Sequence, residues 1–309
     1  MINIASYSSY EYLDRILALN NSIKKYKNVK FHLLPLDEKI IDFFKKNNEK
    51  LICYDPKILK INFNDNFAQN IAIARIGFAK YLLFNQRIQN IHLMDSDNFF
   101  FSDPNKLKKI VKKYDMAFCY HESVNNNTND RFGIFNAGYL YFKKSINTKN
   151  IIEKYINLCK KKVDYSVVHN NKKIVFADQT YLENLTKDFK NILKIKNKSI
   201  NRGPWNIGRY KIEVKNEELF LDEKKLIFYH FSGVKKICKN FYSLGLRMYV
   251  NNKNNIKKHL YSRYIRELFC INNNYNIKIV KPKILHFKSN KLKSLFNIII
   301  QKDYYFISK

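Results

Sequence analysis

The sequence lacks the short motifs that mark several classes of nucleotide-binding protein. Glycine is scarce, with 7 residues among 309. The chain contains neither a Walker phosphate loop nor a glycine-rich dinucleotide fingerprint, which bind phosphates through closely approaching backbone. The stretch from Ser6 to Ser9, near the amino terminus, is not a glycine-rich loop either. A nucleotide, if one binds, must therefore be held by different means.

Cysteine is sparse as well. The chain has 5 cysteines, widely spaced and without a C-x-x-C pair: Cys53, Cys119, Cys159, Cys238 and Cys270. This pattern excludes the common zinc and dithiol redox motifs. We therefore expect reduced, mostly structural thiols in a cytoplasmic protein.

Long uncharged apolar runs are also absent. The best candidate, residues 71–84, contains Arg75 and Lys80, which argues against a membrane-spanning helix. The opening sequence, MINIASYS, has neither a basic leader nor an apolar run long enough for a signal peptide. We expect a chain without a membrane span or secretion signal.

Acidic residues are outnumbered by basic ones, 26 to 57, giving a net charge of +31. Residues 234–309 hold 17 basic and 2 acidic residues (+15), and residues 1–233 hold 40 and 24 (+16). Codon bias can explain the lysine content of the whole chain, but it does not explain this asymmetry. We expect the basic, aromatic end to bind an anionic membrane surface. The protein would then be peripheral at the inner face of the cytoplasmic membrane.

Hydrophobic patterning predicts strands that alternate with helices. Strands are expected over residues 2–7, 29–36, 51–54, 91–94, 116–121 and 135–142, and helices over 13–23 and 67–82. Asp65 is a plausible cap for the second helix. This alternation predicts an α/β domain with a mostly parallel sheet flanked by helices.

The pattern changes after Gly233. Two basic, aromatic helices are expected over residues 238–250 and 256–269, followed by a basic segment with apolar interruptions. We therefore predict a catalytic domain over residues 1–236 and a small basic helical region over residues 237–309.

The most informative stretch reads IHLMDSDNFFFSDP, from Ile91 to Pro104. An apolar strand ends there in Asp95 and Asp97, which can converge on one hard cation such as Mg²⁺ or Mn²⁺. Ligands of parallel sheets bind beyond the carboxyl ends of strands, where these acids fall. No lysine or arginine lies between Gln89 and Pro104 to neutralise them. A solvated turn is the alternative interpretation.

Four further segments follow in a definite order: FNAGYLYF from Phe135, ADQTYLENL from Ala177, RGPWNIGRY from Arg202 and YHFSGVKK from Tyr229. With the Asp-x-Asp stretch and the opening strand and helix, this order resembles nucleotide-sugar glycosyltransferases of GT-A fold. The pattern is similar to that of the bacterial lipooligosaccharide and glycogenin-like enzymes of family 8. The resemblance covers about residues 1–236.

The resemblance implies a set of site residues. Asp95, Asp97 and His230 would coordinate Mn²⁺ or Mg²⁺, which bridges the diphosphate of the donor. The donor itself would be bound by Arg75, Asp95, Asn136, Gly233 and Lys236, with Lys235 and Lys80 as weaker candidates. Asp178 and Gln179 would line the reactive face of the donor sugar. Two further candidates come from the residues themselves: Trp205, which can stack on a sugar ring, and, ranked below the other sites, Asp130 in the asparagine-rich loop 125–130, which can close over the acceptor.

Each of these residues also has a structural interpretation. His230 can be a core histidine, Asp178 a helix N-cap, Arg75 a partner in an ion pair, and Trp205 a packed aromatic. The lysines after Gly233 can belong to the solvated basic end of the chain. The sequence alone leaves these alternatives open.

The implied function is transfer of a hexose from a nucleotide diphosphate sugar, a UDP-sugar by preference, to a hydroxyl of a surface glycan such as lipooligosaccharide or capsule. The family resemblance implies retention of anomeric configuration. An inverting GT-A enzyme, which needs a carboxylate base, is the main alternative. A basic nucleic-acid-binding protein does not account for the acidic motif. A sugar-nucleotide pyrophosphorylase would need the missing glycine-rich loop.

Overall fold

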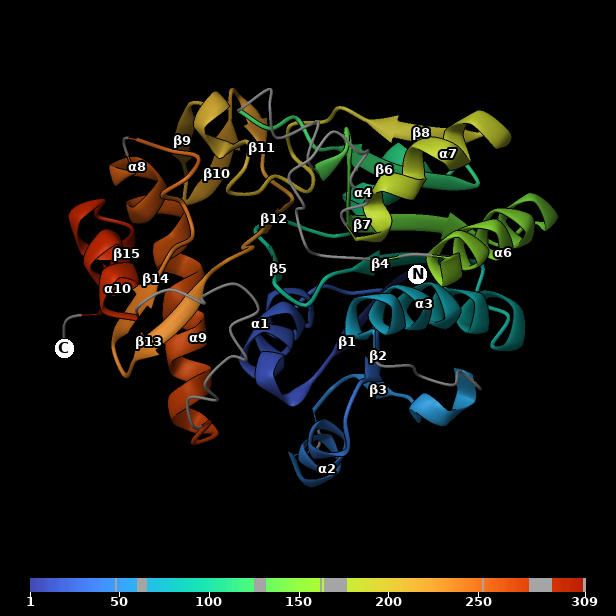
Figure 1. The fold of residues 1–309 in the computed structure, drawn as a ribbon, viewed down its shortest axis with the longest axis horizontal. Coiled ribbons are helices and arrows are strands. Elements are labelled where there is room, and N and C mark those ends of the chain that lie inside the picture. The colour runs from blue at the N-terminus through green and yellow to red at the C-terminus, as the bar shows by residue number, and fades with distance from the viewer. Residues whose placement is uncertain are drawn as a thin grey trace. The chain divides into compact units, whose positions relative to one another are not determined.

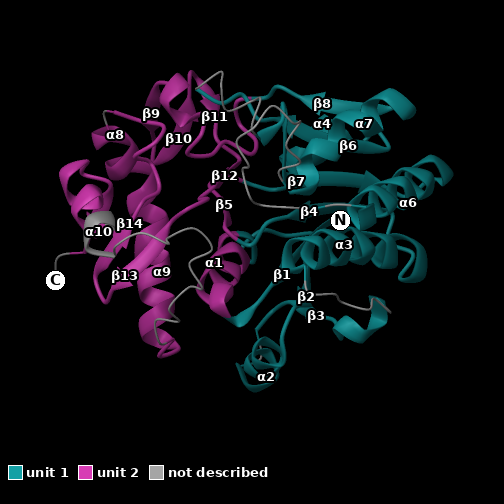
Figure 2. Cartoon of the chain, viewed as in Figure 1, with its two compact units in different colours: residues 1–10, 23–96, 103–197 teal, residues 11–22, 97–102, 198–309 magenta. Residues whose placement is uncertain are grey.

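The structure is a computed structural model of the chain. It describes residues 1–47, 49–59, 66–124, 132–161, 163, 177–251, 253–277 and 291–307. These residues divide into two compact units, shown in Figure 2. Unit 1 comprises residues 1–10, 23–96 and 103–197, and unit 2 comprises residues 11–22, 97–102 and 198–309. The domain boundary expected after residue 236 falls within unit 2 and stays a prediction.

Unit 1 is built on a seven-stranded sheet with the order β3-β2-β1-β4-β7-β6-β8. The strands are β1 Ile2–Ser8, β2 Val29–Pro35, β3 Ile52–Cys53, β4 Asn90–Met94, β6 Met116–Tyr120, β7 Phe135–Lys143 and β8 Ile192–Ile195. Strand β7 runs antiparallel to its neighbours β4 and β6, and the other pairs are parallel. The predicted α/β class with a mostly parallel sheet is confirmed.

Helices cover this sheet, as Figure 1 shows. They are α2 Glu38–Asn47, α3 Phe67–Lys80, α4 Lys106–Val111, α6 Ile146–Lys161 and α7 Tyr181–Asp188. Helix α3 packs against α6, and the core holds fully buried side chains such as Phe78, Leu93 and Phe118. The cap of α3 is Asn66, whose side chain accepts a hydrogen bond from the Gln69 backbone. The expected cap, Asp65, lies outside the described residues.

Unit 2 contains α1 Leu13–Ile23 and three small sheets. One pairs β5 Asn98–Phe100 with β12 Phe228–His230. The second consists of β9 Ile212–Lys215, β10 Glu218–Leu221 and β11 Lys224–Lys225, and the third of β13 Lys235–Cys238, β14 Phe241–Ser243 and β15 Tyr304–Phe306. Its later helices are α8 Asn254–Ile256, a π-helical turn Lys257–Tyr261, α9 Ser262–Asn274 and α10 Lys291–Ile300.

The helix predicted over residues 238–250 is wrong. That stretch forms the end of β13, all of β14 and then turns. Tyr242 in β14 pairs with Lys236 in β13 and with Tyr305 in β15, and Gly245 has a φ of 72°, which a helix does not accommodate. The helix predicted over residues 256–269 is confirmed as part of the α8 to α9 run. Residues 278–290 lie outside the described part.

Within the described residues, no helix has both the length and the apolar character needed to cross a membrane. The five cysteines are free thiols, as the sequence predicts.

Candidate active site

In unit 2, two paired strands bring Asp97 and His230 together. His230 lies opposite Asn98 in the antiparallel β5 and β12 pair, so it also neighbours Asp97, the residue before β5. The backbone N–H of Phe231 donates to the Asp97 carbonyl at 2.8 Å. The His230 Nε2 atom lies 2.9 Å from Asp97 Oδ1. The register of one short strand pair therefore places an imidazole against a carboxylate.

The charge of Asp97 is supported by its surroundings. Burial raises the pKa of this carboxyl group, but the charge and hydrogen bond of His230 and the charge of Arg15 outweigh it, so the pKa is lowered overall. The Trp205 ring lies edge-on to the His230 ring, with centroids 5.2 Å apart. Trp205 is itself buried, and its ring packs against the imidazole of His230 and limits how that imidazole can turn.

In unit 1, Asp95 follows β4 directly and is held by three residues. Its backbone N–H donates a hydrogen bond to the carbonyl of Gly138 at 3.2 Å. Its Oδ1 atom accepts a hydrogen bond from the Tyr7 hydroxyl at 2.7 Å and lies 3.3 Å from Nη1 of Arg75. The sequence near the acids contains no cation, but α3 supplies one. Arg75 therefore forms the ion pair that the sequence left open as its structural interpretation.

One ligand atom from each of Asp95, Asp97 and His230 lies within 4.8 Å of the others. Two carboxylate oxygens and one imidazole nitrogen form a donor set that suits Mn²⁺ or Mg²⁺. The structure thus gathers the three residues that the sequence nominated as metal ligands. Asp95 and Asp97 follow the carboxyl end of β4, where ligands of such sheets bind.

Arg75 connects Asp95 to a second carboxylate in unit 1. Its Nε atom lies 3.6 Å from Asp178 Oδ2, and its Nη2 donates a short hydrogen bond to the carbonyl of Ala137. Asp178 Oδ2 also accepts a hydrogen bond from the Tyr155 hydroxyl at 3.1 Å. Burial raises the pKa of Asp178, although the charge of Arg75 opposes this.

Asp178 does not act as the predicted N-cap. It is the first residue of a 3₁₀ turn, Asp178–Thr180, that leads into α7, and its side chain turns to Arg75 and Tyr155. The neighbouring Gln179 is also buried and donates a short hydrogen bond to the carbonyl of Phe132. Both residues are held by tertiary contacts and not by the helix that follows them.

Asn136 lies in β7, directly before Ala137, whose carbonyl accepts a hydrogen bond from Arg75. Its Oδ1 accepts a hydrogen bond from the Gly138 backbone at 2.9 Å. The register between β6 and β7 shifts after Phe118, so that Asn136 faces Cys119. Such an irregularity re-aims side chains at a strand end. Arg75, Asp95, Asn136, Asp178 and Gln179 thus all belong to unit 1.

The loop after His230 belongs to unit 2 and contains Gly233, with a φ of 85°. Arg15, from α1, donates to the Val234 carbonyl at 2.8 Å. Burial and the charges of Arg15 and Arg247 lower the pKa of Lys235, and burial is also the main cause that lowers the pKa of Lys236. Both lysines are half-buried in the structure. They are the first residues of β13 and pair with β14, so they do not belong to a solvated tail.

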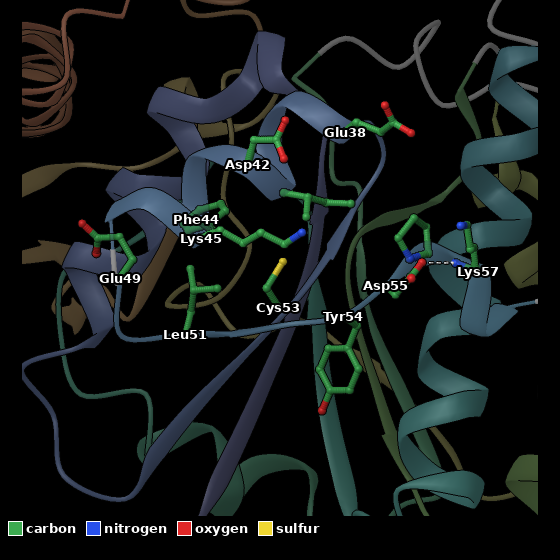
Figure 3. Close-up of a pocket in the computed structure, with 12 residues that line it drawn as sticks. Glu38, Asp42, Phe44, Lys45, Glu49, Leu51, Cys53, Tyr54, Asp55 and Lys57 are labelled. Atoms are coloured by element: carbon green, nitrogen blue, oxygen red, sulfur yellow. Dashed lines mark hydrogen bonds between the residues drawn. The ribbon is translucent and has the colours of Figure 1, made fainter.

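Other candidates do not join these groups. Lys80 forms a surface ion pair with Glu153 at 3.0 Å, and Asp130 lies outside the described residues. A pocket of about 580 Å³ in unit 1 is lined by none of the predicted site residues. Figure 3 shows the Lys45 side chain reaching toward Cys53 in this pocket. Burial raises the pKa of Cys53 despite Lys45, so the thiol is not an activated nucleophile.

Sequence reasoning missed three residues that hold the site: Tyr7, Arg15 and Tyr155. Tyr7 is the last residue but one of β1, and a polar group near the ligand-binding edge of a sheet is a usable signal. Arg15 and Tyr155 lie in amphipathic helices and carry no local motif. Their roles emerge only from the contacts that tertiary packing creates.

Comparisons with known proteins place the fold. No family model matches the chain. Two uncharacterized proteins of Bacillus subtilis (strain 168) are similar. YfnD is 28% identical over 221 residues, covering 69% of each chain. YfnF is 25% identical over 165 residues, covering 50% of this chain and 53% of its own. This chain therefore spans about two thirds of one relative and about half of the other.

Among solved structures, an active-site mutant of LgtC matches with a TM-score of 0.50 and 13% identity, over 76% of this chain and 89% of that one. The glycosyltransferase GlyE of Streptococcus pneumoniae TIGR4 matches with a TM-score of 0.41 and 19% identity, over 63% of this chain and 45% of that one. The chain has the GT-A fold. Membership of family 8 stays a prediction, since similarity at this level shows the fold alone.

Proposed function

We propose that this GT-A chain is a metal-dependent glycosyltransferase. It transfers a hexose from a nucleoside diphosphate sugar, with UDP as the nucleotide, to a hydroxyl of a surface glycan such as lipooligosaccharide or capsule. The observation that carries this proposal is the cluster of Asp95, Asp97 and His230, with ligand atoms within 4.8 Å of one another. A GT-A sheet with that cluster at the end of β4 has the parts needed to hold a diphosphate through a cation.

The donor set fits a divalent ion. Carboxylates are hard oxygen ligands, and a neutral imidazole is a common additional ligand for Mn²⁺. When bound, the ion acts as a Lewis acid and stabilises the negative charge that develops on the departing nucleoside diphosphate. Asp95, Asp97 and His230 would hold it. The 2.9 Å contact between His230 and Asp97 fixes both side chains before the ion arrives.

The remaining residues divide between the two halves of the donor. Gly233 and Lys236 bind the diphosphate, because a glycine at positive φ lets backbone approach the phosphates and the ammonium supplies charge. Arg75 and Asn136 bind the donor beside β7. Asp178 accepts hydrogen bonds from sugar hydroxyls, and Gln179 lies near the anomeric carbon. Transfer then proceeds with retention of configuration, in which the leaving phosphate takes the proton from the acceptor hydroxyl.

The experiment is a thermal-shift screen of UDP-, GDP- and CMP-sugars with and without Mn²⁺. CMP-sugars carry no diphosphate, so they serve as a built-in control. We expect a UDP-sugar to raise the Tm only when Mn²⁺ is present. Asp97→Asn should abolish both this shift and turnover. The matched control is Asp188→Asn, which removes an exposed acid that pairs with Lys154 on the surface. Absence of any metal-dependent nucleotide shift in the wild type would reject the enzyme proposal.

The proposed acceptor is lipid-linked, which places the enzyme at a membrane surface. In α10, Leu295, Phe296, Ile299 and Ile300 are at least one third exposed. They belong to the stretch of 17 basic and 2 acidic residues over 234–309. Apolar side chains amid lysines suit the interface of an anionic membrane. The enzyme would act there from the cytoplasmic side.

Liposome sedimentation tests this placement. Vesicles with anionic lipid should carry down the wild type at low salt but not at high salt, and should not carry down a chain that ends after Asn276. The double variant Phe296→Ser with Ile299→Ser should sediment less than a chain with Val214→Ser, which changes an exposed apolar residue of β9. Sedimentation insensitive to salt, truncation and both α10 substitutions would reject this membrane contact.

A further inference from the structure

The carboxylate of Asp178 is held through one of its two oxygens. Oδ2 accepts the Tyr155 hydroxyl at 3.1 Å and lies 3.6 Å from Nε of Arg75. Within the described part of the chain, these contacts with other side chains all go to Oδ2. Asp178 is 3% exposed, so the orientation of its carboxylate is set by the protein and not by solvent.

Both partners are themselves fixed. Arg75 is bound at its other nitrogens, where Nη1 faces Asp95 and Nη2 donates to Ala137. Tyr155 is fully buried in α6, and its hydroxyl also lies 3.4 Å from the Asp178 main-chain carbonyl. One hydroxyl thus meets the main chain and the side chain of the same residue. The carboxylate can turn only if one of these anchors moves.

The contact with Arg75 is incomplete. Its buried Nε atom has no hydrogen-bond partner among the residues that the structure describes, and the 3.6 Å between this atom and Oδ2 of Asp178 is too long for a good hydrogen bond. A movement of a few tenths of an ångström would complete it, and contacts at active sites often tighten when the ligand binds. In the structure as it stands, Tyr155 is the side chain that makes the hydrogen bond to this carboxylate.

We propose that Tyr155 is a positioning residue that determines how the donor sugar is bound: it holds Oδ2 of Asp178 so that Oδ1 is presented to a hydroxyl of the hexose. This inference rests on the proposed function. The terminal torsion of an aspartate is broad, so without the tyrosine hydroxyl the carboxylate can rotate. Binding of the sugar would then have to offset the conformational entropy that is lost when this carboxylate becomes ordered. The nucleoside diphosphate makes no use of Asp178, and its binding should not change.

The affinity for a UDP-hexose can therefore be compared with the affinity for UDP alone. A merely structural role of Tyr155 would not change one of these affinities without the other. Sites built to hydrogen-bond a particular hydroxyl reject sugars that lack it or place it differently. If Oδ1 of Asp178 is no longer held in place, the binding of the preferred donor hexose should therefore weaken most. The preference among epimeric donors should shrink, while affinity for the free nucleotide stays the same.

The experiment compares Tyr155→Phe with Tyr139→Phe. Tyr139 is also fully buried, and its hydroxyl hydrogen-bonds Nδ1 of His92 at 2.9 Å within the sheet. Each variant therefore loses the contacts of one buried hydroxyl group, and unfolding in urea shows whether the losses of stability match. Calorimetric titrations with UDP, UDP-glucose and UDP-galactose, all with Mn²⁺, measure the Kd values. Steady-state kinetics give KM and kcat for the better donor.

For Tyr155→Phe we expect the affinity for the better UDP-hexose to fall about two- to tenfold, the value of one hydrogen bond. The Kd of UDP should be unchanged, and the ratio between the two epimers should move toward one. Tyr139→Phe should change none of these. Equal losses for UDP and UDP-hexose, or no loss for either, would overturn the positioning role. If wild-type protein binds no UDP compound with Mn²⁺, the proposed function itself fails, which is a distinct result.

Discussion

The imidazole of His230 lies 2.9 Å from the carboxylate of Asp97, although the two residues are far apart in the sequence. The pairing of β5 with β12 creates this contact, since it aligns the start of one strand with the end of the other. A lone Asp-x-Asp turn is a weak metal ligand. His230 adds a third donor atom within 4.8 Å of those of Asp95 and Asp97.

His230→Asn should therefore weaken divalent-metal binding while leaving the fold intact. Even residues that only support a metal ligand contribute about 10- to 100-fold to metal affinity, so losing a ligand should cost at least about tenfold. The measurement is the Mn²⁺ concentration that gives half of the UDP-dependent thermal shift. His259→Asn, in the helical turn before α9, is the control and should leave that concentration unchanged. An unaltered Mn²⁺ requirement in His230→Asn would contradict the ligand assignment.

Arg75 should prove to be a counter-ion shared by Asp95 and Asp178. Arg75→Met leaves two carboxylates near each other without it, and breaking a buried ion pair in this way costs about 3–5 kcal/mol. Adding Asp178→Asn removes one uncompensated charge, so the double variant should be more stable than Arg75→Met alone. Urea unfolding followed by circular dichroism completes this double-mutant cycle. Strictly additive losses would show that the two side chains do not interact.

The sequence predicted the architecture of unit 1 well because its strands are apolar and short and its helices have clear periodicity. It also nominated Asp95 and Asp97 from a local motif at a strand end, and His230 through the family resemblance. The order of segments carried more information than any single one. The fold prediction is confirmed, whereas the roles of the donor-binding residues stay predictions.

Where the sequence failed, the information was tertiary. The counter-ion of Asp95 is absent from the surrounding stretch and comes from Arg75, on a helix that ends before β4. Tyr155 belongs to no motif. From the sequence, a tyrosine in an amphipathic helix is predicted to be a core residue, and only the structure shows that its hydroxyl contacts Asp178. The mistaken helix over residues 238–250 has a related cause. The strand β14 in that stretch is set by its pairing with β15, which lies far along the chain and leaves no local pattern.

Stability should fall on mild acidification because two buried histidines resist protonation. Burial, aided by Lys30, lowers the pKa of His32 to about 4, and burial with Lys108 lowers the pKa of His92 to about 3. Unfolded histidine takes up a proton near pH 6.5. Between pH 6.5 and pH 4 the unfolded chain therefore binds more protons than the folded one, so stability decreases as the pH falls.

For His32, the expected loss in the free energy of unfolding between pH 7 and pH 5 is about 2 kcal/mol. Urea unfolding at both pH values, followed by circular dichroism, measures it. His32→Asn should be less stable than the wild type at pH 7, since the contacts of the ring with Tyr54 and Asn3 are disturbed, but should lose less on acidification. The same acid-induced loss in His32→Asn and wild type would refute this explanation.

Gly233 and Gly245 face each other in unit 2, yet alanine should be tolerated very differently at the two positions. Both have positive φ, 85° and 72°, so each alanine incurs a backbone cost of about 1–2 kcal/mol. A Cβ on Gly233 would meet the Cα of Gly245 at 3.5 Å, an ordinary contact. A Cβ on Gly245 would lie 3.0 Å from the carbonyl carbon and oxygen of Gly233, and backbone cannot yield as a flexible side chain does.

Gly245→Ala should therefore destabilise unit 2 by about 1–3 kcal/mol more than Gly233→Ala, the usual cost of overpacking. Trp205 is the only tryptophan of the chain, so its fluorescence in urea reports unit 2. Because the displaced backbone belongs to the loop after His230, Gly245→Ala should also weaken binding of UDP with Mn²⁺. The control is Gly133→Ala in unit 1. Gly133 has a φ of 83°, and a Cβ there would make an ordinary 3.5 Å contact with the Thr180 side chain, so this variant measures the free-energy cost of the backbone conformation without overpacking. If Gly245→Ala costs no more than Gly233→Ala, the close approach of the two glycines does not shape this loop.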